Sequence, residues 1–454
     1  MDNIVMARAL FGTSMAFHII FATLGVGVPF MVVFAEILYH VKKNKHYAIL
    51  ARRWTKGFAI ILGVAIPSGT LVGVMLSLLF PGFMEIVGKV IAVPFQVELW
   101  AFMLEALFMS IYVYAADRLS PVLRIVSVFF VALGASASAV LITDAHAWMN
   151  TPRGFDLVNG EVTNVDPIAA IFSPSLWTTS LHVLSSAYMT GAFIIVSLAA
   201  YKLLKRNKTK EEMEYHARSL LLGLVVGGAL SLFTALNGHA TAQMLHKYQP
   251  EKLAAAEGLF ETTDHAPLAV FGRANPDTGE IEGGIEIPWA LSFLAGNSFD
   301  TVVKGLNEFP EELWPPLYIH TLFNIMVMIG MALIGLAFGT IAWRYILKRT
   351  LPRWWLWVLT SAGALSLIGI ETGWIFSCTG RQPWTIYHMQ LTKDAATKSE
   401  NLGPLFVLFL GIYIVLLFLT AFVLRFYFKR HPVSKDLSPN TPVLEQDEGV
   451  QSNG

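Results

Sequence analysis

Long apolar runs constrain this chain more than any other feature of its sequence. A run of about 20 apolar residues can cross the roughly 30 Å hydrocarbon core of a bilayer as a helix. About nine such runs occur, and they begin near Ala9, Phe58, Pro94, Val122, Leu181, Leu220, Leu317, Trp354 and Leu402. With 55% hydrophobic and 14% charged residues, the chain is too apolar for an ordinary soluble domain. We therefore predict an all-α integral membrane protein, a bundle of about nine transmembrane helices.

The orientation of the bundle can be predicted from the basic residues between the runs. Cytoplasmic connections are enriched in Lys and Arg. In this chain the basic residues gather in alternate connections: Lys42, Lys43, Lys45, Arg52, Arg53 and Lys56; Arg118 and Arg124; Lys202, Lys205, Arg206, Lys208 and Lys210; Arg344, Lys348, Arg349 and Arg353; Arg425, Lys429 and Arg430. We expect the N-terminus outside and the C-terminus in the cytoplasm. The first run continues to about Tyr39 without a cleavage site, so we expect a retained span and not a signal peptide.

Two segments stand apart from the apolar runs. The outside connection over residues 245–316 is far longer than the others, and long connections of this kind are usually functional or disordered. Residues 431–454 are polar and lack apolar periodicity, which predicts a disordered cytoplasmic tail. Residues 1–430 then form one transmembrane unit.

Charge and cysteine content exclude several classes of protein. Lys and Arg together equal Asp and Glu in number, so the balance of charge indicates no nucleic-acid partner. Cys378 is the one cysteine of the sequence, which excludes an intrachain disulfide framework and the CxxCH attachment of c-type haem.

Ionisable side chains within the apolar runs are functional candidates, because a charge at bilayer depth is costly. They are His18, Glu98, Glu105, His182, His239, His320 and Glu371. A structural hydrogen bond is the alternative for each histidine. Seven residues separate Glu98 from Glu105, close to two helical turns, so both carboxylates lie on one face. The runs offer few basic partners for them, which favours a proton path or a haem site over buried ion pairs.

The histidines and methionines lie on separate predicted helices. The sequence has no HExxH motif, no paired Glu-x-x-His helices and no dense cluster of Cys and His. Scattered His and Met side chains on different helices are typical of noncovalent haem sites in membrane bundles.

Five ordered segments resemble subunit I of the cytochrome bd quinol oxidases, and together they cover nearly the whole chain. They are FHIIF (17–21), WMNTPRGF (148–155), QPEKLAAAEG (249–258), FNIMV (323–327) and GRQPW (380–384). The resemblance implies a multi-pass protein of a bacterial or archaeal cytoplasmic membrane. It also implies a second membrane subunit, subunit II, as partner, and allows for a small single-span subunit.

The resemblance assigns haem ligands residue by residue. His182 and Met326 match the axial ligands of a low-spin haem b, and Met as a ligand stabilises reduced iron. His18 matches the ligand of a high-spin haem near the dioxygen site. Glu98 and Glu105 match paired glutamates that carry protons to that site. Two high-spin haems are expected, haem b with haem d or haem b alone.

This chain departs from the family pattern at two positions. The family has Arg two residues before the Met ligand, where this chain has Asn324, and loss of that charge should lower the haem potential. The family has a haem-ligating Glu three residues before the Arg of GRQPW, where this chain has Cys378. Either the Cys378 thiolate takes over as ligand or the site has changed, and Glu371, seven residues earlier on a similar helical face, could serve instead if the helix shifts. Near this site, we predict that Arg381 pairs with a haem propionate and that Trp374 also contacts the cofactor.

The quinol side follows the family pattern. Lys252 and Glu257 lie in the QPxKxAAxE setting, which implies that they contact membrane quinol, Glu257 as a proton acceptor.

The predicted enzyme oxidises quinol outside, passes electrons through the low-spin haem to the high-spin pair, and reduces dioxygen to water with cytoplasmic protons. One alternative is a related cytochrome b with another electron acceptor. An alternative of a different class is a proton-coupled transporter.

Overall fold

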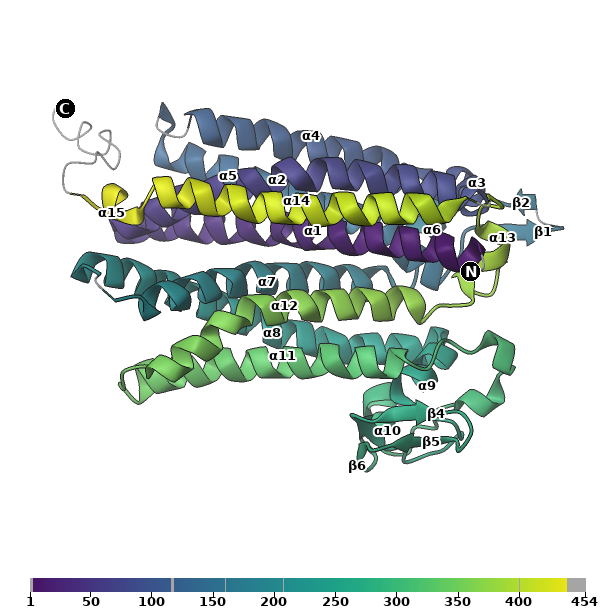
Figure 1. Ribbon diagram of the computed structural model, residues 1–454. Helices are drawn as coiled ribbons and strands as arrows, with labels where there is room; N and C mark the ends of the chain where they lie inside the picture. The colour runs from purple at the N-terminus through teal and green to yellow at the C-terminus, as the bar shows by residue number, and fades with distance from the viewer. Residues whose placement is uncertain (1–2, 116–117, 160, 207, 400, 439–454) are drawn as a thin grey trace.

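The computed structural model describes residues 3–115, 118–159, 161–206, 208–399 and 401–438. Within these ranges, nine helices are long and apolar enough to cross a membrane, as predicted. They are α1 (Asn3–Lys42), α2 (Lys45–Leu79), α4 (Ala92–Ala115), α5 (Pro121–Asn150), α7 (Leu176–Leu204), α8 (Lys210–Tyr248), α11 (Ile319–Ile341, extended by the π-helical turn η4, Ala342–Ile346), α12 (Arg353–Thr379) and α14 (Leu402–Arg430). Figure 1 shows these helices side by side in one bundle.

Side-chain caps fix where several of these helices begin. Asn44 accepts a hydrogen bond from the His46 N–H at the start of α2. At the start of α8, Thr209 and Glu212 form a reciprocal capping box. Such caps satisfy N–H groups that have no partner within the helix. Between the caps the helices satisfy their own backbone groups, as spanning segments must in lipid.

The bundle consists of two groups of helices that meet along α1 and α7. Helices α1, α2, α4, α5 and α14 form the first group, and α7, α8, α11 and α12 form the second. At the crossing of α1 and α7 the two backbones touch. A Cβ on Gly27 would lie 2.4 Å from the Ala187 carbonyl oxygen, and a Cβ on Gly191 would lie 2.5 Å from the Gly27 carbonyl carbon. Glycine at both positions therefore permits this close approach.

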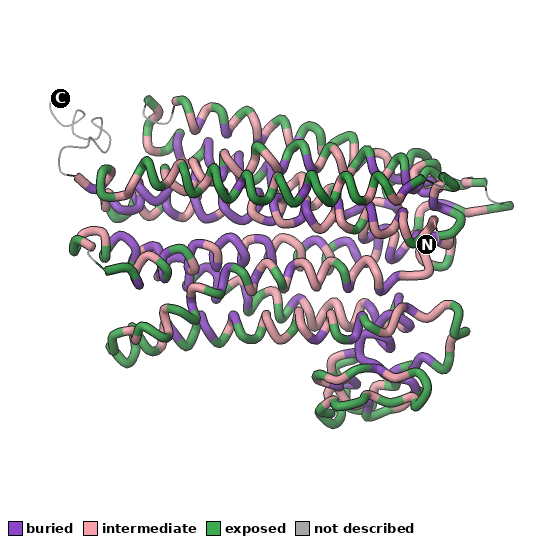
Figure 2. The backbone as a smooth tube through the Cα atoms, viewed as in Figure 1, coloured by how far each residue is buried: buried purple, intermediate pink, exposed green. Residues whose placement is uncertain are grey.

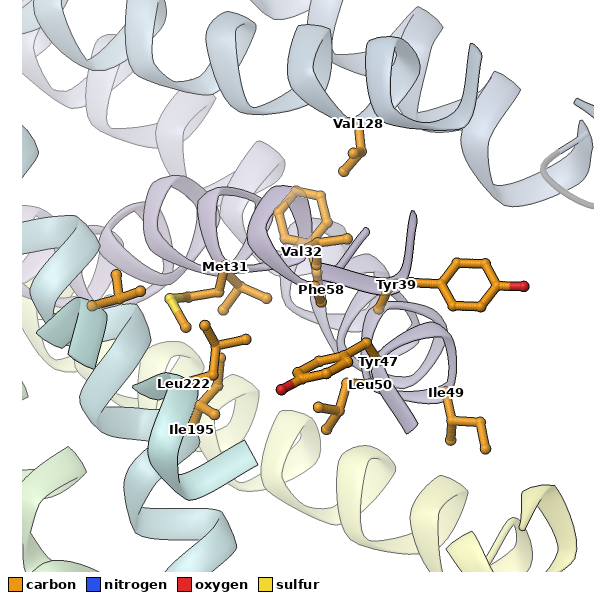
Figure 3. Close-up of a cluster of buried hydrophobic side chains, with 14 of the residues drawn as sticks. Met31, Val32, Tyr39, Tyr47, Ile49, Leu50, Phe58, Val128, Ile195 and Leu222 are labelled. Atoms are coloured by element: carbon orange, nitrogen blue, oxygen red, sulfur yellow. The ribbon is translucent and has the colours of Figure 1, made fainter. Parts of the chain in front are cut away.

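Buried side chains lie between the helices, and the outer faces are apolar but exposed. Figure 2 shows α14 mostly exposed along its length. The largest buried cluster joins α1, α2, α4, α5, α7 and α8, with Met31, Tyr39, Phe58 and Val128 among its members (Figure 3). Exposed apolar faces suit contact with lipid or with another membrane subunit.

The connections that carry the basic clusters lie at one end of the bundle, and the N-terminus and the long connection lie at the other (Figure 1). The predicted tail begins with a short helix, α15 (Val433–Asp436), instead of disordered chain. Arg53 Nη1 lies 2.6 Å from Asp436 Oδ2, which holds this start of the tail against α2. The rest of the predicted tail, residues 439–454, lies outside the described residues.

The long connection over residues 245–316 is ordered. Its elements are α9 (Pro250–Glu257), β3 (Leu268–Val270), β4 (Arg273–Asn275), β5 (Glu280–Glu282), β6 (Ile285–Ile287), α10 (Ala290–Gly296) and the 3-10 turns η2 (Leu306–Glu308) and η3 (Glu311–Leu313). Strand β3 pairs with β6 and β4 pairs with β5, both antiparallel. Gly258, with φ of 66°, ends α9 directly after Glu257.

Shorter elements complete the same end of the bundle. They are α3 (Pro81–Val90), β1 (Asp156–Val158), β2 (Glu161–Thr163), α6 (Pro167–Ile171), β7 (Trp384–Ile386), β8 (Gln390–Leu391) and α13 (Thr392–Ala395). Strand β1 pairs with β2, and β7 pairs with β8. The GRQPW segment therefore leads from the end of α12 into the β7–β8 hairpin.

Candidate functional sites

The predicted low-spin haem ligands lie on two helices of the second group, His182 on α7 and Met326 on α11. His182 Nδ1 is buried and has no hydrogen-bond partner among the described residues. A Cβ on Gly373 of α12 would lie 2.9 Å from Met326 Sδ, so glycine at this position lets the Met326 side chain pack directly against α12. A buried ring nitrogen without a partner is a feature that an axially ligated haem would use.

The hydrogen bonds around His18 fix which ring nitrogen is free. His18 Nδ1 lies 2.9 Å from Ser68 Oγ on α2, and Ser68 donates its own proton to the Ala65 carbonyl oxygen. Ser68 therefore accepts from Nδ1–H, which leaves the Nε2 lone pair available to a metal. Gly69 gives the ring its space, because a Cβ there would lie 2.9 Å from His18 Cε1. Ser68 was not predicted, and only a structure could reveal this contact from another helix.

Glu98 and Glu105 face α5 from the same side of α4. Ser138 Oγ donates to Glu98 Oε1 at 2.6 Å. Glu105 is 5% exposed, and its Cβ would lie 3.0 Å from a Cβ on Gly134. Ser138 and Gly134 are one turn apart on α5, so the seven-residue spacing does place both acids along one interface. Ser138 is a hydroxyl neighbour that the sequence reasoning missed.

The end of α12 gathers several of the predicted cofactor-binding residues. The Trp374 ring meets the His146 ring of α5 edge to face, with centroids 5.4 Å apart. His146 Nε2 also lies 2.9 Å from Ser377 Oγ. Glu371 Oε1 is buried and lacks a partner within the described part of the chain, whereas the Cys378 side chain is half-buried. His146 thus supports the position of Trp374.

Arg381 is a buried cation without a counter-ion. It is 6% exposed, its Nη2 contacts Met149 Sδ at 3.8 Å, and its Nε and Nη1 have no partner among the residues described. Burying an unpaired guanidinium is costly, so this geometry calls for an anionic ligand. A haem propionate would satisfy it, because a carboxylate accepts hydrogen bonds from guanidinium N–H groups.

Lys252 is buried on α9, against the end of α12. Its Nζ donates to the Ser377 carbonyl oxygen at 2.9 Å and lies 5.3 Å from the Phe376 ring centroid. A Cβ on Gly380 would lie 2.9 Å from Lys252 Cε, which gives the glycine of GRQPW a packing role. Burial, followed by the charge of Arg381, lowers the pKa of Lys252 to about 7.

Glu257 closes α9 and is 4% exposed. Its Oε2 has no hydrogen-bond partner in the described structure. Burial raises the pKa of Glu257 to about 8. The same helix is tied to the β7–β8 connection through Glu251, which accepts hydrogen bonds from the Tyr387 hydroxyl and from His388 Nε2. The chain thus holds both predicted quinol residues on one anchored helix.

Asn324, which replaces the family Arg, holds the long connection in place. Its Oδ1 accepts from the Phe271 N–H at 3.0 Å, and its Nδ2 donates to the His320 carbonyl oxygen at 3.0 Å. His320 is fully buried, and its two ring nitrogens lie 2.8 Å from the Ala256 oxygen and 2.9 Å from the Phe271 oxygen. These bonds join α11 to α9 and to the β3–β4 turn.

Two buried acids were missed by the sequence reasoning. Asp144 on α5 is 2% exposed, and neither carboxylate oxygen has a partner among the described residues. Glu36 on α1 is 6% exposed and accepts a hydrogen bond from the Tyr112 hydroxyl. Both lie within apolar runs, so the criterion applied to Glu98 would have identified them.

The donor set fits haem better than a bare metal ion. Within the described ranges, no group of three or more His, Cys, Asp and Glu side chains converges as a metal site would require. Haem needs only one or two axial ligands from the protein. His18, His182, Met326 and the buried Arg381 are suited to that demand.

Comparisons with known proteins identify the family of this chain. Residues 6–432 match the family described as cytochrome bd terminal oxidase subunit I. A Bacillus subtilis (strain 168) protein named "Putative cytochrome bd menaquinol oxidase subunit I" is 58% identical over 439 residues, 96% of this chain and 99% of that protein. A second B. subtilis (strain 168) protein, cytochrome bd ubiquinol oxidase subunit 1, is 31% identical over 89% of this chain and 88% of its own length.

A solved structure shares the fold. The bd oxidase from Geobacillus thermodenitrificans matches with a TM-score of 0.90 and 43% identity, over 95% of this chain and 99% of the matched chain. The chain therefore belongs to the cytochrome bd terminal oxidase subunit I family.

Proposed function

We propose that this chain is the quinol-oxidising, haem-bearing subunit of a membrane-bound terminal oxidase. One observation carries the proposal: α9 holds a buried lysine and a buried glutamate. It packs beside the end of α12, directly before the GRQPW segment. Buried ionisable groups without ion pairs are costly unless a ligand uses them. Relatives named as menaquinol and ubiquinol oxidase subunits support quinol as that ligand.

Glu257 acts as the proton acceptor for quinol. A base works best when its pKa lies near the working pH, and burial brings the pKa of Glu257 to about 8. Lys252 donates a hydrogen bond to a quinone oxygen, and it can do so as an ammonium or as a neutral amine. The protons that leave quinol are released outside, at the end of the bundle where α9 lies.

His182 and Met326 hold the low-spin haem b, and His18 Nε2 holds a high-spin haem. For the second high-spin haem, the unpartnered carboxylate oxygen favours Glu371 over Cys378 as the ligand. Arg381 neutralises a propionate, and Trp374 packs against the cofactor. When bound, the haems, haem b with haem d or haem b alone, supply electron transfer and the reduction of dioxygen to water.

The protons consumed with dioxygen come from the cytoplasm, along α4. Glu98 and Glu105 hold and transfer these protons, and Ser138 orients Glu98 through its hydrogen bond. Because quinol protons leave on one side and dioxygen protons enter on the other, turnover separates charge across the membrane. Subunit II covers an exposed apolar face of the bundle, with or without a small single-span subunit, in a bacterial or archaeal cytoplasmic membrane.

Replacing Glu257 with Gln tests the proposal. We expect quinol oxidation by the purified complex to fall at least about a hundredfold, the range typical of a lost general base, while haem content stays unchanged. Glu286→Gln is the matched control, because Glu286 is an exposed acid in the same connection and should have no effect.

Three outcomes would contradict parts of this proposal. A complex without haem would exclude the oxidase and favour a proton-coupled transporter. Haem without quinol-dependent oxygen uptake would favour a cytochrome b with another acceptor, as the Cys378 departure suggests. Normal quinol oxidation by the Glu257 variant would remove that residue from the site.

A further inference from the structure

Tyr112 extends the row of buried polar groups on α4. Glu98, Glu105 and Tyr112 recur every seven residues, so they lie on one face of the helix. Glu105 and Tyr112 are each 5% exposed, while Leu99, Trp100, Met103 and Leu107 on the remaining surface of α4 are exposed and apolar. A hydroxyl two turns beyond Glu105, on the same buried face, continues the row towards the end of the bundle where the basic connections gather (Figure 1).

Tyr112 is joined there to a buried acid on another helix. Its hydroxyl donates a hydrogen bond to Glu36 Oε1 of α1. Glu36 lies six residues before the end of α1 at Lys42, which is about 9 Å along the helix. Arg124, whose guanidinium lies 5.5 Å from the Tyr39 ring centroid, and the exposed Arg52 both act electrostatically on Glu36. The acid thus lies between the buried row and the charged end of the bundle.

Apart from Arg124, Arg52 and the Thr55 hydroxyl, the surroundings of the pair are mostly apolar. Tyr112 belongs to the buried cluster of Figure 3, together with Phe58 and Val128. An acid and a hydroxyl in such surroundings are poor packing elements, because hydrophobic residues of similar size would stabilise the interface equally well or better. Ionisable groups at membrane depth generally have a function. Holding α1 against α4 does not by itself require a carboxylate at this position.

We propose that Glu36 and Tyr112 form the cytoplasmic entrance of the proton path that leads along α4 to Glu105 and Glu98. The inference rests on the proposed function, because this end of the bundle needs to take up protons only if the enzyme reduces dioxygen with protons from the cytoplasm. A proton from the cytoplasm protonates the Glu36 carboxylate. Once Glu36 is protonated, the Tyr112 hydroxyl turns away from it, and Glu36 donates to the Tyr112 oxygen as Tyr112 passes its own proton onward; the hydroxyl then turns back towards Glu36.

This transfer is balanced. One proton enters at Glu36, one leaves Tyr112 towards Glu105, and both groups return to their starting states. Two helical turns, about 10 Å, separate Tyr112 from Glu105, a span that a short chain of hydrogen-bonded waters can bridge. No oxidant or other reactant takes part.

The test uses the purified oxidase complex in liposomes with Glu36→Gln and Tyr112→Phe. Both changes keep the shape of the side chain and remove its proton-transfer function. Reduction of haem by quinol without dioxygen should stay normal, because it needs no inward proton uptake. Oxygen uptake and proton uptake should each fall at least about tenfold, with a larger solvent deuterium isotope effect. Glu36→Asp, which keeps a carboxylate, should recover part of the rate.

Matched controls come from the same end of the bundle. Tyr215→Phe alters another buried tyrosine of the same cluster, and Glu214→Gln alters an exposed acid. Both should turn over at the normal rate. Normal proton uptake in the Glu36 and Tyr112 variants would overturn the inference and leave the proposed function intact. Loss of haem without recovery in Glu36→Asp would overturn it in favour of a structural role. Absence of quinol-dependent oxygen uptake in the unaltered complex would instead contradict the proposed function.

Discussion

Single residues decide which metal chemistry this chain can support. Met326 is one of several methionines on α11, and a methionine in a membrane helix is usually a packing residue. Its sulfur packs against Gly373, where any larger residue would displace it. The resemblance to bd oxidases selected this residue from sequence, and its role as a haem ligand stays a prediction.

Met326→Leu should abolish the low-spin spectrum of the reduced protein. Leucine keeps the volume and removes the thioether, so a coordination bond is lost while packing changes little. Met331→Leu is the control, since Met331 is 59% exposed on the same helix. Reduced-minus-oxidised spectra of both variants are the measurement, and an unchanged spectrum for Met326→Leu would exclude this ligand.

The pH dependence of quinol oxidation should report Glu257. Burial raises the pKa of Glu257 to about 8, so its carboxyl is mostly protonated at pH 7 and becomes an active base as pH rises. We expect kcat/KM for quinol to increase up to about pH 8 and then level off. In Glu257→Gln, kcat/KM should no longer rise with pH. If the rise remained, it would have to be assigned to another titrating group.

Between helices, α1 and α7 approach each other closely where they cross at Gly27 and Gly191. This contact joins the helix group of His18 to that of His182, so it sets how the two predicted haem regions lie relative to each other. Hydropathy identified both helices, but it does not indicate at which residues the two helices contact each other. A glycine in an apolar run has several structural explanations, and only the packed structure distinguishes them.

Gly191→Val should destabilise the protein, because the new side chain meets backbone atoms of α1 that cannot rotate away. Overpacking of this kind typically costs about 1–3 kcal/mol. The apparent unfolding midpoint of the detergent-solubilised complex should fall accordingly. Gly25→Ala on α1 should leave it nearly unchanged, since no neighbouring atom lies within 4 Å of the added Cβ. Equal midpoints for the two variants would argue against a tight crossing.

At the scale of the whole molecule, the sequence predicted the fold more completely than the sites. Apolar length determines a spanning helix almost by itself, so all nine predicted spans were confirmed within the described residues. Ser68, Ser138 and Ser377 could not be predicted as partners, because each contacts a residue more than 35 positions away. Glu36 and Asp144 could have been predicted, since an acid in an apolar run was the criterion already in use.

The direction of the whole bundle in the membrane is the remaining prediction. An odd number of spans places the two ends of the bundle's chain on opposite sides, and the basic connections all lie at the end of the bundle where α15 lies (Figure 1). Because basic connections remain in the cytoplasm, a fluorescent protein fused after the C-terminus should fluoresce and a fused alkaline phosphatase should be inactive. A phosphatase inserted at Gly283, in the long connection, should be active.

The orientation also decides the energetics of the enzyme. If α9 faces outside, quinol protons leave there, and the row on α4 draws its protons from the cytoplasm. If the phosphatase were active at the C-terminus, the same residues would release protons inside and draw them from outside. The oxidase would then dissipate the proton gradient and could not conserve energy. The fusion experiment therefore tests the direction of the proton path together with the topology.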